Sequence, residues 1–378
     1  MVRIWSGIMS LAVLVCVTGA AHAASGGSVE SDREETRIDK EFEHAEFADE
    51  YLVRIAERIL AGAPSRPAQA VRMRALRAPD PFIFCLDNGA AYVSTGLLAR
   101  LQNDSQLAML LAPELSSVLA PNTTIQQEYD AKVRRQAGPK LLAVIATAGL
   151  AVFPMMSSEN KAYDAHVEAI VLENDKVGLD WARRAGFDPS QAPAAAQRLA
   201  AVLEKEGHVG RGRLGSAMAL ERRRDQLARA VEALPPDATI KTLPDPADPL
   251  HTISHRLSID LARELVGDNR AVEFSSIIDR VEHEYGVSGN SACLRARFLR
   301  QQSVSAQVPQ EVFAAYQACT AQPDAPVGNY RELGLLYRDA GNAPAAIRAF
   351  EDYLKRAPSA ADAPIIKLYI EELRVKPQ

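Results

Sequence analysis

The sequence predicts an α+β protein that is mostly helical, with a small edge sheet in its N-terminal half and an all-helical tail. Apolar residues recur at helical spacing along much of the chain, whereas residues 82–98 have the short apolar runs and central turn of paired strands. The composition, 47% apolar and 24% charged, is typical of a globular protein. A length of 378 residues allows two or three domains.

Residues 1–23 have the pattern of a secretory signal peptide. Arg3 is the only charge, an apolar stretch follows, and small residues precede a cleavage site after Ala23. The pattern predicts a periplasmic or secreted protein. A retained membrane anchor is the alternative, although the apolar stretch is shorter than the ~20 residues that span a bilayer. Residues 24–40, rich in Ser, Gly and charge, predict a flexible N-terminus.

Charge and hydropathy restrict the partners. The formal net charge is -5, and the arginines at 222–224 form a local helical patch, so the sequence does not predict nucleic-acid binding. Residues 141–153 are apolar throughout but too short to cross a bilayer. They predict a buried core helix, with peripheral membrane contact as the alternative.

The elements follow in order. Residues 42–60 have apolar positions at helical spacing, and residues 81–98 read as two strands joined by the turn Asp87-Asn88-Gly89. Further helices are predicted over residues 104–119, 162–184, 193–203 and 214–234, with Gly186 ending the second of these. The Pro-rich stretch 242–250 predicts a loop.

The tail has the pattern of a helical repeat. Residues 327–360 place aromatic and small residues at the diagnostic positions Tyr330, Leu333, Gly334, Tyr337, Gly341, Ala346, Phe350 and Pro358. This pattern resembles the tetratricopeptide repeat of about 34 residues. Residues 365–373 predict a capping helix. We expect a helical tail over residues 261–378 that binds proteins, with Tyr330 and Tyr337 as candidate contact residues, and the interior of the repeat as the alternative place for these side chains.

The cysteines predict one disulfide. Of four cysteines, Cys16 lies in the leader, which leaves three in an exported chain. Cys85 lies in the apolar run PFIFCL and is expected to be buried as a small apolar residue. We therefore expect Cys293 to pair with Cys319.

The stretch GAAYVSTGLLARLQNDSQLAMLLAPELSSVLA, residues 89–120, resembles the envelope zinc metallopeptidases of the HtpX and BepA type. In that family an edge strand and a T-x-G-L-L turn lead into a helix bearing H-E-x-x-H, whose histidines hold zinc while the glutamate acts as general base. The resemblance implies a gluzincin-like domain over residues 41–260 with Glu114 at the position of the base.

A second segment, residues 171–189, resembles the family's E-x-x-A-D-x-x-G motif and the G-y-D-P that follows it. The positions that agree are Asp175, Gly178, Gly186, Asp188 and Pro189. In the family, the third zinc ligand is a glutamate four residues before that aspartate. That position is Val171 in this chain.

The metal ligands are therefore missing. Pro113, Ser117 and Val171 stand where His, His and Glu are expected, and neither proline nor valine has a donor atom while serine is a poor zinc ligand. Pro113 should also kink or break the helix. The resemblance then implies a pseudopeptidase without cofactor, a vestigial Glu114, and a scaffold or chaperone-like role toward envelope or outer-membrane proteins.

An active enzyme is the alternative hypothesis. His251 and His255 have the i, i+4 spacing that lets two imidazoles share one metal on a helix face. No carboxylate stands at a matching third position, so two solvated histidines on a helix are the simpler interpretation. Zinc is expected only if these histidines serve as displaced ligands of a metalloendopeptidase.

Overall fold

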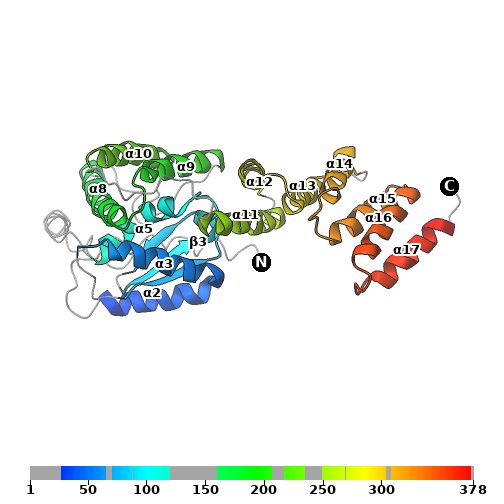
Figure 1. Ribbon diagram of the computed structural model, residues 1–378, viewed down its shortest axis with the longest axis horizontal. Coiled ribbons are helices and arrows are strands. Elements are labelled where there is room, and N and C mark those ends of the chain that lie inside the picture. The colour runs from blue at the N-terminus through cyan, green and yellow to red at the C-terminus, as the bar shows by residue number, and fades with distance from the viewer. Residues whose placement is uncertain are drawn as a thin grey trace. The chain divides into compact units, whose positions relative to one another are not determined.

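The computed structural model describes residues 27–64, 70–86, 88–119, 160–206, 217–234, 249–268, 270–303 and 308–375. Within this part the protein is mostly helical with one small sheet, which confirms the expected class (Figure 1). The leader, the apolar segment 141–153 and residues 242–248 of the Pro-rich loop lie outside the described residues.

The chain divides into two compact units, Met1–Leu257 and Ser258–Gln378. The division falls within helix α11 (Pro249–Asp268), and the boundary that the sequence suggests, after residue 260, lies in the same helix.

The sheet of the first unit has three strands in the order β1-β3-β2. β2 (Ile83–Cys85) and β3 (Ala90–Ser94) pair antiparallel, and Gly89 in the turn between them has φ 83°, a conformation that glycine adopts without strain. These are the two strands predicted from the sequence. β1 (Arg72–Leu76) is an additional strand, parallel to β3, with Arg72 opposite Ala90.

The outer edge of β1 is closed by the segment that precedes α3 (Glu46–Ala61). The amide of Ala45 donates to the carbonyl of Ala75 at 2.8 Å, and the amide of Arg77 donates to the carbonyl of Glu43 at 2.7 Å. The amide of Ala75 donates to a carboxylate oxygen of Asp49 at 2.7 Å. The backbone groups at this edge are thus already used, so an added peptide strand would have to displace them.

Residues 24–40 were expected to be flexible, and from Gly27 onward this expectation is wrong, because α2 (Gly27–Glu41) is a helix that packs on the sheet. Ile38 lies in an apolar cluster with Leu76, Phe84 and Tyr92. The polar residues of the helix are paired as well: Arg72 donates two hydrogen bonds to Glu35. A charge-rich segment is ordered here because the charges have partners and one face is apolar.

The described part of the first unit also contains α4 (Thr95–Leu98), α5 (Asp104–Leu119), α8 (Asn160–Arg184), α9 (Gln191–Glu206) and α10 (Ala217–Glu232). α5 is buried along most of its length and packs against α3, α8, α9 and β2. α9 and α10 pack on each other. α5 is therefore the central helix of this unit.

The second unit continues with six helices: α12 (Ala271–Tyr285), α13 (Gly289–Gln302), α14 (Gln310–Thr320), α15 (Gly328–Asp339), α16 (Ala343–Arg356) and α17 (Ala363–Val375). Each helix packs mainly on the next one along the chain. α15 and α16 approach closely where Gly334 faces Phe350: a Cβ at Gly334 would lie 2.4 Å from the ring. The glycine makes room for the aromatic side chain.

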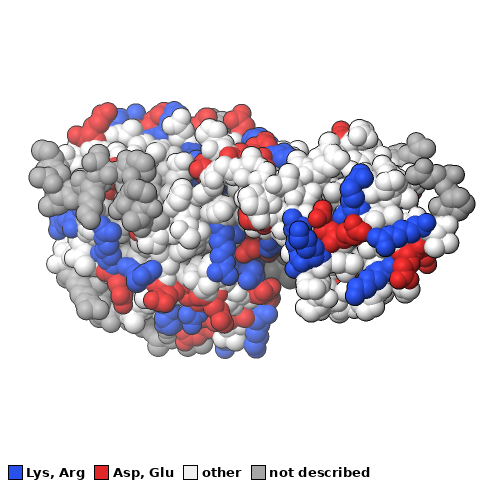
Figure 2. Space-filling model, turned by 45° about the vertical axis from the view of Figure 1, so that its right-hand side comes forward, with Lys and Arg blue, Asp and Glu red and all other residues white. Residues whose placement is uncertain are grey.

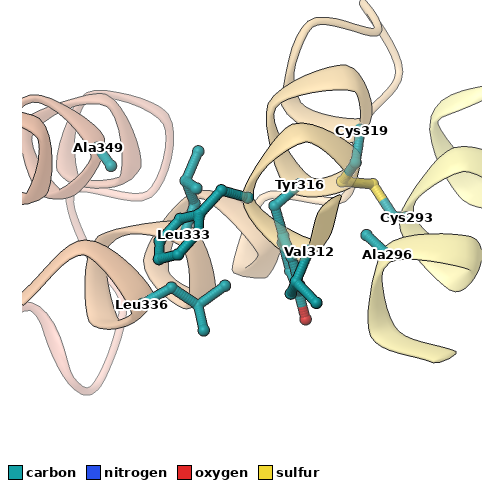
Figure 3. Packing of buried hydrophobic residues seen from close by; sticks show 9 residues of the cluster. Cys293, Ala296, Val312, Tyr316, Cys319, Leu333, Leu336 and Ala349 are labelled. Carbon is teal, nitrogen blue, oxygen red and sulfur yellow. A yellow bond between two sulfur atoms is a disulfide. The ribbon is translucent and has the colours of Figure 1, made fainter. Parts of the chain in front are cut away.

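A disulfide joins α13 to α14. Cys293 and Cys319, the pair expected from the sequence, are bonded, and both are buried at the edge of the cluster that contains Val312 and Tyr316 (Figure 3). Cys85, in β2, is buried and lies outside this disulfide. The bridge closes a loop over a sequence separation of 26.

We predict that this bridge is a main stabiliser of the second unit. Cys293→Ser/Cys319→Ser should lower the free energy of unfolding by roughly 3 kcal/mol, because the reduced chain regains loop entropy. Denaturant unfolding of the protein with and without reductant measures the effect, and the double variant, which has no bridge, should not respond to reductant. Alkylation of both cysteines in the native, unreduced protein would contradict the prediction.

Candidate functional site

The turn before α5 is fastened by its side chains. The Ser94 hydroxyl accepts hydrogen bonds from the amides of Leu97 at 3.0 Å and Phe82 at 2.9 Å, so it caps α4 and anchors the preceding loop. The Thr95 hydroxyl accepts from the amide of Ala78 at 3.1 Å and donates to its carbonyl at 3.2 Å. The turn therefore fixes where α5 begins.

Gly96 allows the closest approach in this turn. A Cβ at this position would lie 2.1 Å from the carbonyl oxygen of Pro79. Arg100, fully buried, donates to that same carbonyl at 2.8 Å and to the carbonyl of Gly96 at 2.7 Å. The S-T-G-L-L motif thus has a sufficient structural explanation.

Pro113 lies at the crossing of α5 and α8. A Cβ at Gly178 would lie 2.3 Å from the backbone nitrogen of Pro113 and 2.7 Å from the carbonyl carbon of Ala112, so the two backbones touch here. α5 runs as one helix from Asp104 to Leu119, so the break that the sequence allowed at Pro113 is absent. Proline has no N–H to bond within the helix, and this is the nitrogen that Gly178 covers.

Glu114 is 1% exposed. Its side chain therefore does not face a solvated cleft. The neighbouring hydroxyls are occupied: Ser117 donates to the carbonyl of Glu114 at 2.8 Å, while Ser116 donates to the carbonyls of Pro113 at 3.1 Å and of Asn174 at 3.3 Å. Ser116 therefore links α5 to α8.

The register of the two helices follows from three contacts. Ser105, near the start of α5, accepts from the amide of Asp188 just beyond α8, Pro113 meets Gly178, and Ser116 meets Asn174. The helices are antiparallel, so the turn of α8 that contains residue 171 follows toward the Ser117 end of α5. The side chain of Val171 lies outside the described part of the structure.

Asp175 forms a buried ion pair with Arg223 of α10. Arg223 donates through Nε to Oδ2 at 2.8 Å and through Nη2 to Oδ1, and the side chains are 1% and 9% exposed. Two parallel bonds from a guanidinium to a carboxylate fix both orientation and distance. Asp175 thus holds α8 to α10.

Residues 186–189 end α8 and start α9. Gly186, with φ 80°, turns the chain, and the buried ring of Phe187 lies under the guanidinium of Arg58, whose Cζ is 3.9 Å from the ring centroid. Arg58 also donates to the carbonyls of Ala185 and Gly186. Asp188 then accepts from the amide of Ser190 at 2.9 Å. The segment thus caps the C-terminus of α8 and then the N-terminus of α9.

His251 and His255 lie on α11, the first exposed and the second half-buried. Burial, and then the proximity of His251, lowers the pKa of His255 below its ordinary value. Neutral imidazoles are what a metal requires. Among the described residues, however, no group of three or more His, Cys, Asp or Glu side chains is arranged to hold a metal ion.

The two candidate contact residues of the tail differ. Tyr330 is 6% exposed, donates its hydroxyl to the carbonyl of Thr320 at 2.8 Å, and lies under the guanidinium of Arg356. Tyr330 is therefore an interior residue of the tail. Tyr337 is half-buried, stacked on Phe313 with 5.2 Å between ring centroids.

Arg223 was missed as a site residue, because the arginines at 222–224 look like one exposed patch. Its position on α10 carried the signal: Leu220, Arg223 and Leu227 are spaced by three and four and are all buried. A charged residue on an apolar stripe indicates a buried partner.

No protein-family model matches this chain, and no curated protein matches it in sequence. None of the helices that the structure describes is long and apolar enough to cross a bilayer. On the face shown in Figure 2, acidic and basic side chains are interspersed over both units and form no stripe of one sign.

We predict that Gly178→Ala destabilises the first unit by about 1–3 kcal/mol, because the methyl group would meet backbone atoms that cannot rotate away. Gly267→Ala, in α11, is the matched control, since a Cβ there meets nothing within 4 Å. That change should stabilise its helix by roughly 0.5–1 kcal/mol. Chemical denaturation checks both, and equal effects would contradict the close crossing.

The buried ion pair gives a separate prediction. Asp175→Asn should cost about 3–5 kcal/mol, because it leaves the guanidinium of Arg223 buried without its counter-charge. Asp180→Asn on the same helix weakens two partly exposed ion pairs, with Arg183 and Arg184, and should cost less than about 1 kcal/mol. Asp175→Leu/Arg223→Met should recover most of the loss. Thermal and denaturant unfolding measure the stability of these three variants. An Asp175→Asn variant as stable as Asp180→Asn would refute the assignment of Asp175 and Arg223 as a buried ion pair.

Proposed function

We propose that this chain is a pseudopeptidase: a metallopeptidase-like domain that has lost its zinc ligands, joined to a tetratricopeptide-like tail, and acting as a protein-binding scaffold or chaperone-like factor in the bacterial envelope. The observation that carries the proposal is the crossing of α5 and α8. At the positions where the resemblance expects metal chemistry, Gly178 packs on the backbone of Pro113.

The residues at these positions do not fit zinc. Pro113 offers no donor atom: where a histidine would supply an imidazole nitrogen, the proline side chain has only carbon atoms. The Ser117 hydroxyl is committed to the carbonyl of Glu114. Without a metal to acidify a water molecule, a buried Glu114 has no nucleophile to activate.

The antiparallel register supports the link to the metallopeptidases. It puts Pro113 and Ser117 on α5 beside the face of α8 that carries Asn174 and Gly178, with position 171 one turn further along. Three ligands spread over two helices must meet at such a crossing. The arrangement is what remains when a two-helix metal site is replaced by packing.

The tail supports the protein-binding half of the proposal. Successive helices that each pack on the next leave a long row of exposed surface, which is how solenoid repeats bind proteins. Burial raises the pKa of Tyr316, and Glu332 adds to this while Arg297 and Arg300 oppose it. Each of these three charged residues of α13 and α15 therefore lies within electrostatic range of Tyr316 of α14, and both arginines are exposed. We choose this polar face as the contact surface.

The compartment is supported by two independent features. The Cys293–Cys319 disulfide needs an oxidising environment to persist. The start of the chain has the pattern of an export signal. An envelope protein meets unfolded or membrane-bound chains, which is where a protein-binding factor without catalysis would act.

The proposal predicts binding without cleavage. The purified protein, prepared without chelator, should contain no stoichiometric zinc by mass spectrometry. Mixed with a urea-denatured outer-membrane porin, it should reduce light scattering from aggregation and leave the porin intact on gels. Glu114→Gln should behave like the wild type, because Glu114 performs no chemistry.

Two controls sharpen this experiment. Arg297→Glu/Arg300→Glu should weaken the suppression of aggregation, whereas Arg348→Glu/Lys355→Glu, two exposed cations of α16, should not. One zinc per chain with proteolysis that is lost in Glu114→Gln would overturn the pseudopeptidase. If that activity were lost in His251→Ala/His255→Ala, the displaced histidines would be its ligands. If the protein neither cleaved the porin nor suppressed its aggregation, the scaffold role toward such proteins would be refuted.

A further inference from the structure

The last helix, α17, exposes an apolar stripe. Of the five large apolar side chains that are strongly exposed in the described part of the chain, three lie on this helix. They are Ile365, Leu368 and Val375, which are 51%, 57% and 80% exposed. At 3.6 residues per turn the three fall within about 80° of arc, so they share one face of the helix, which Glu372 interrupts between Leu368 and Val375.

The opposite face of α17 is also apolar. Ile366 and Ile370 are buried against a cluster that contains Phe350 and Tyr353 of α16. A helix that is apolar on two opposite faces is built to lie between two layers. Within the described part of the chain, α16 supplies one layer, and the stripe faces solvent.

The charges beside the stripe indicate what covers it. Lys367 and Glu371 are four residues apart and lie on the same flank of α17, both exposed. Arg374, by contrast, is engaged within the unit by Glu351 at 2.7 Å. One flank of the stripe therefore carries a cation and an anion in a fixed order along the helix.

We propose that α17 pairs with α17 of a second copy of this chain, antiparallel about a two-fold axis. In an antiparallel pair, each flank of one helix faces the same flank of the other. Lys367 of each copy then meets Glu371 of the other copy, so the two-fold axis generates two equivalent ion pairs. The axis then passes near residue 369, and Leu368 of each copy lies beside it. In a parallel pair this flank would face the opposite one, and the match would be lost.

The contact is small, and this sets its strength. One 13-residue helix with three apolar contact residues buries less than a standard protein interface. Glu372 lies inside the same arc, between Leu368 and Val375 along the helix, and burying its carboxylate would cost free energy, which limits the contact further. We expect a reversible dimer with a Kd on the order of 10–100 µM, independent of the scaffold role proposed above.

Charge exchange tests the geometry. Lys367→Glu gives each flank two anions and should weaken self-association about tenfold or more, and Glu371→Lys, with two cations, should do the same. The double exchange Lys367→Glu/Glu371→Lys should restore the dimer. A mixture of the two single variants should form a heterodimer, because an all-acidic flank then meets an all-basic one. Sedimentation equilibrium from 5 to about 500 µM measures each.

The outcomes distinguish the occupants of the stripe. Leu368→Glu, at an exposed position, should fold normally by circular dichroism and be monomeric throughout. A wild-type protein that remains monomeric over this range would overturn the proposal. So would single charge variants that dimerise like the wild type, since another surface would then form the contact. Binding of wild type, but not Leu368→Glu, to lipid vesicles without self-association would assign the stripe to a membrane instead.

Discussion

The contact between the backbones of α5 and α8 is the constraint on which the first unit depends. Gly178 lets α8 lie against Pro113, and this crossing sets the depth at which both helices are buried. The same helix is held again at its C-terminal end, where Gly62 of the α3 terminus abuts the carbonyl of Trp181. These two glycine contacts, both near the C-terminal end of α8, leave the helix little freedom to slide, because a shift brings backbone atoms into collision.

Around this crossing the polar groups serve packing. The Asp175–Arg223 pair fastens α10, Ser116 bridges α5 to α8, and Arg100 fastens the turn that leads into α5. A buried charge is tolerated only with a well-placed partner. Backbone contact at the crossing and one internal ion pair are thus enough to hold α5, α8 and α10 together.

The second unit follows a different logic. Its helices pack in sequence order, so each interface depends on a few local complementary shapes, such as Gly334 against Phe350. Among the described helices, α17 packs mainly on α16. The disulfide strengthens the α13–α14 pair, where the repeat pattern of the sequence is weakest.

The sequence by itself determined what depends on near neighbours along the chain: the β2–β3 turn at Gly89, the helical periods of α5 and α15 to α17, and the chemical fact that Pro113 and Val171 carry no metal ligand. Tertiary structure decided what depends on partners far along the chain. The charged segment of α2 is a helix because it pairs with Arg72 and packs on the sheet. β1 is a strand because β3 bonds one of its edges and residues 43–45 bond the other. Tyr330 is interior because Thr320 and Arg356 enclose it. Local propensity is weak, and long-range burial and pairing outweigh it. The arginines next to Arg223 in the sequence suggest an exposed position, but its ion pair with Asp175 makes it buried.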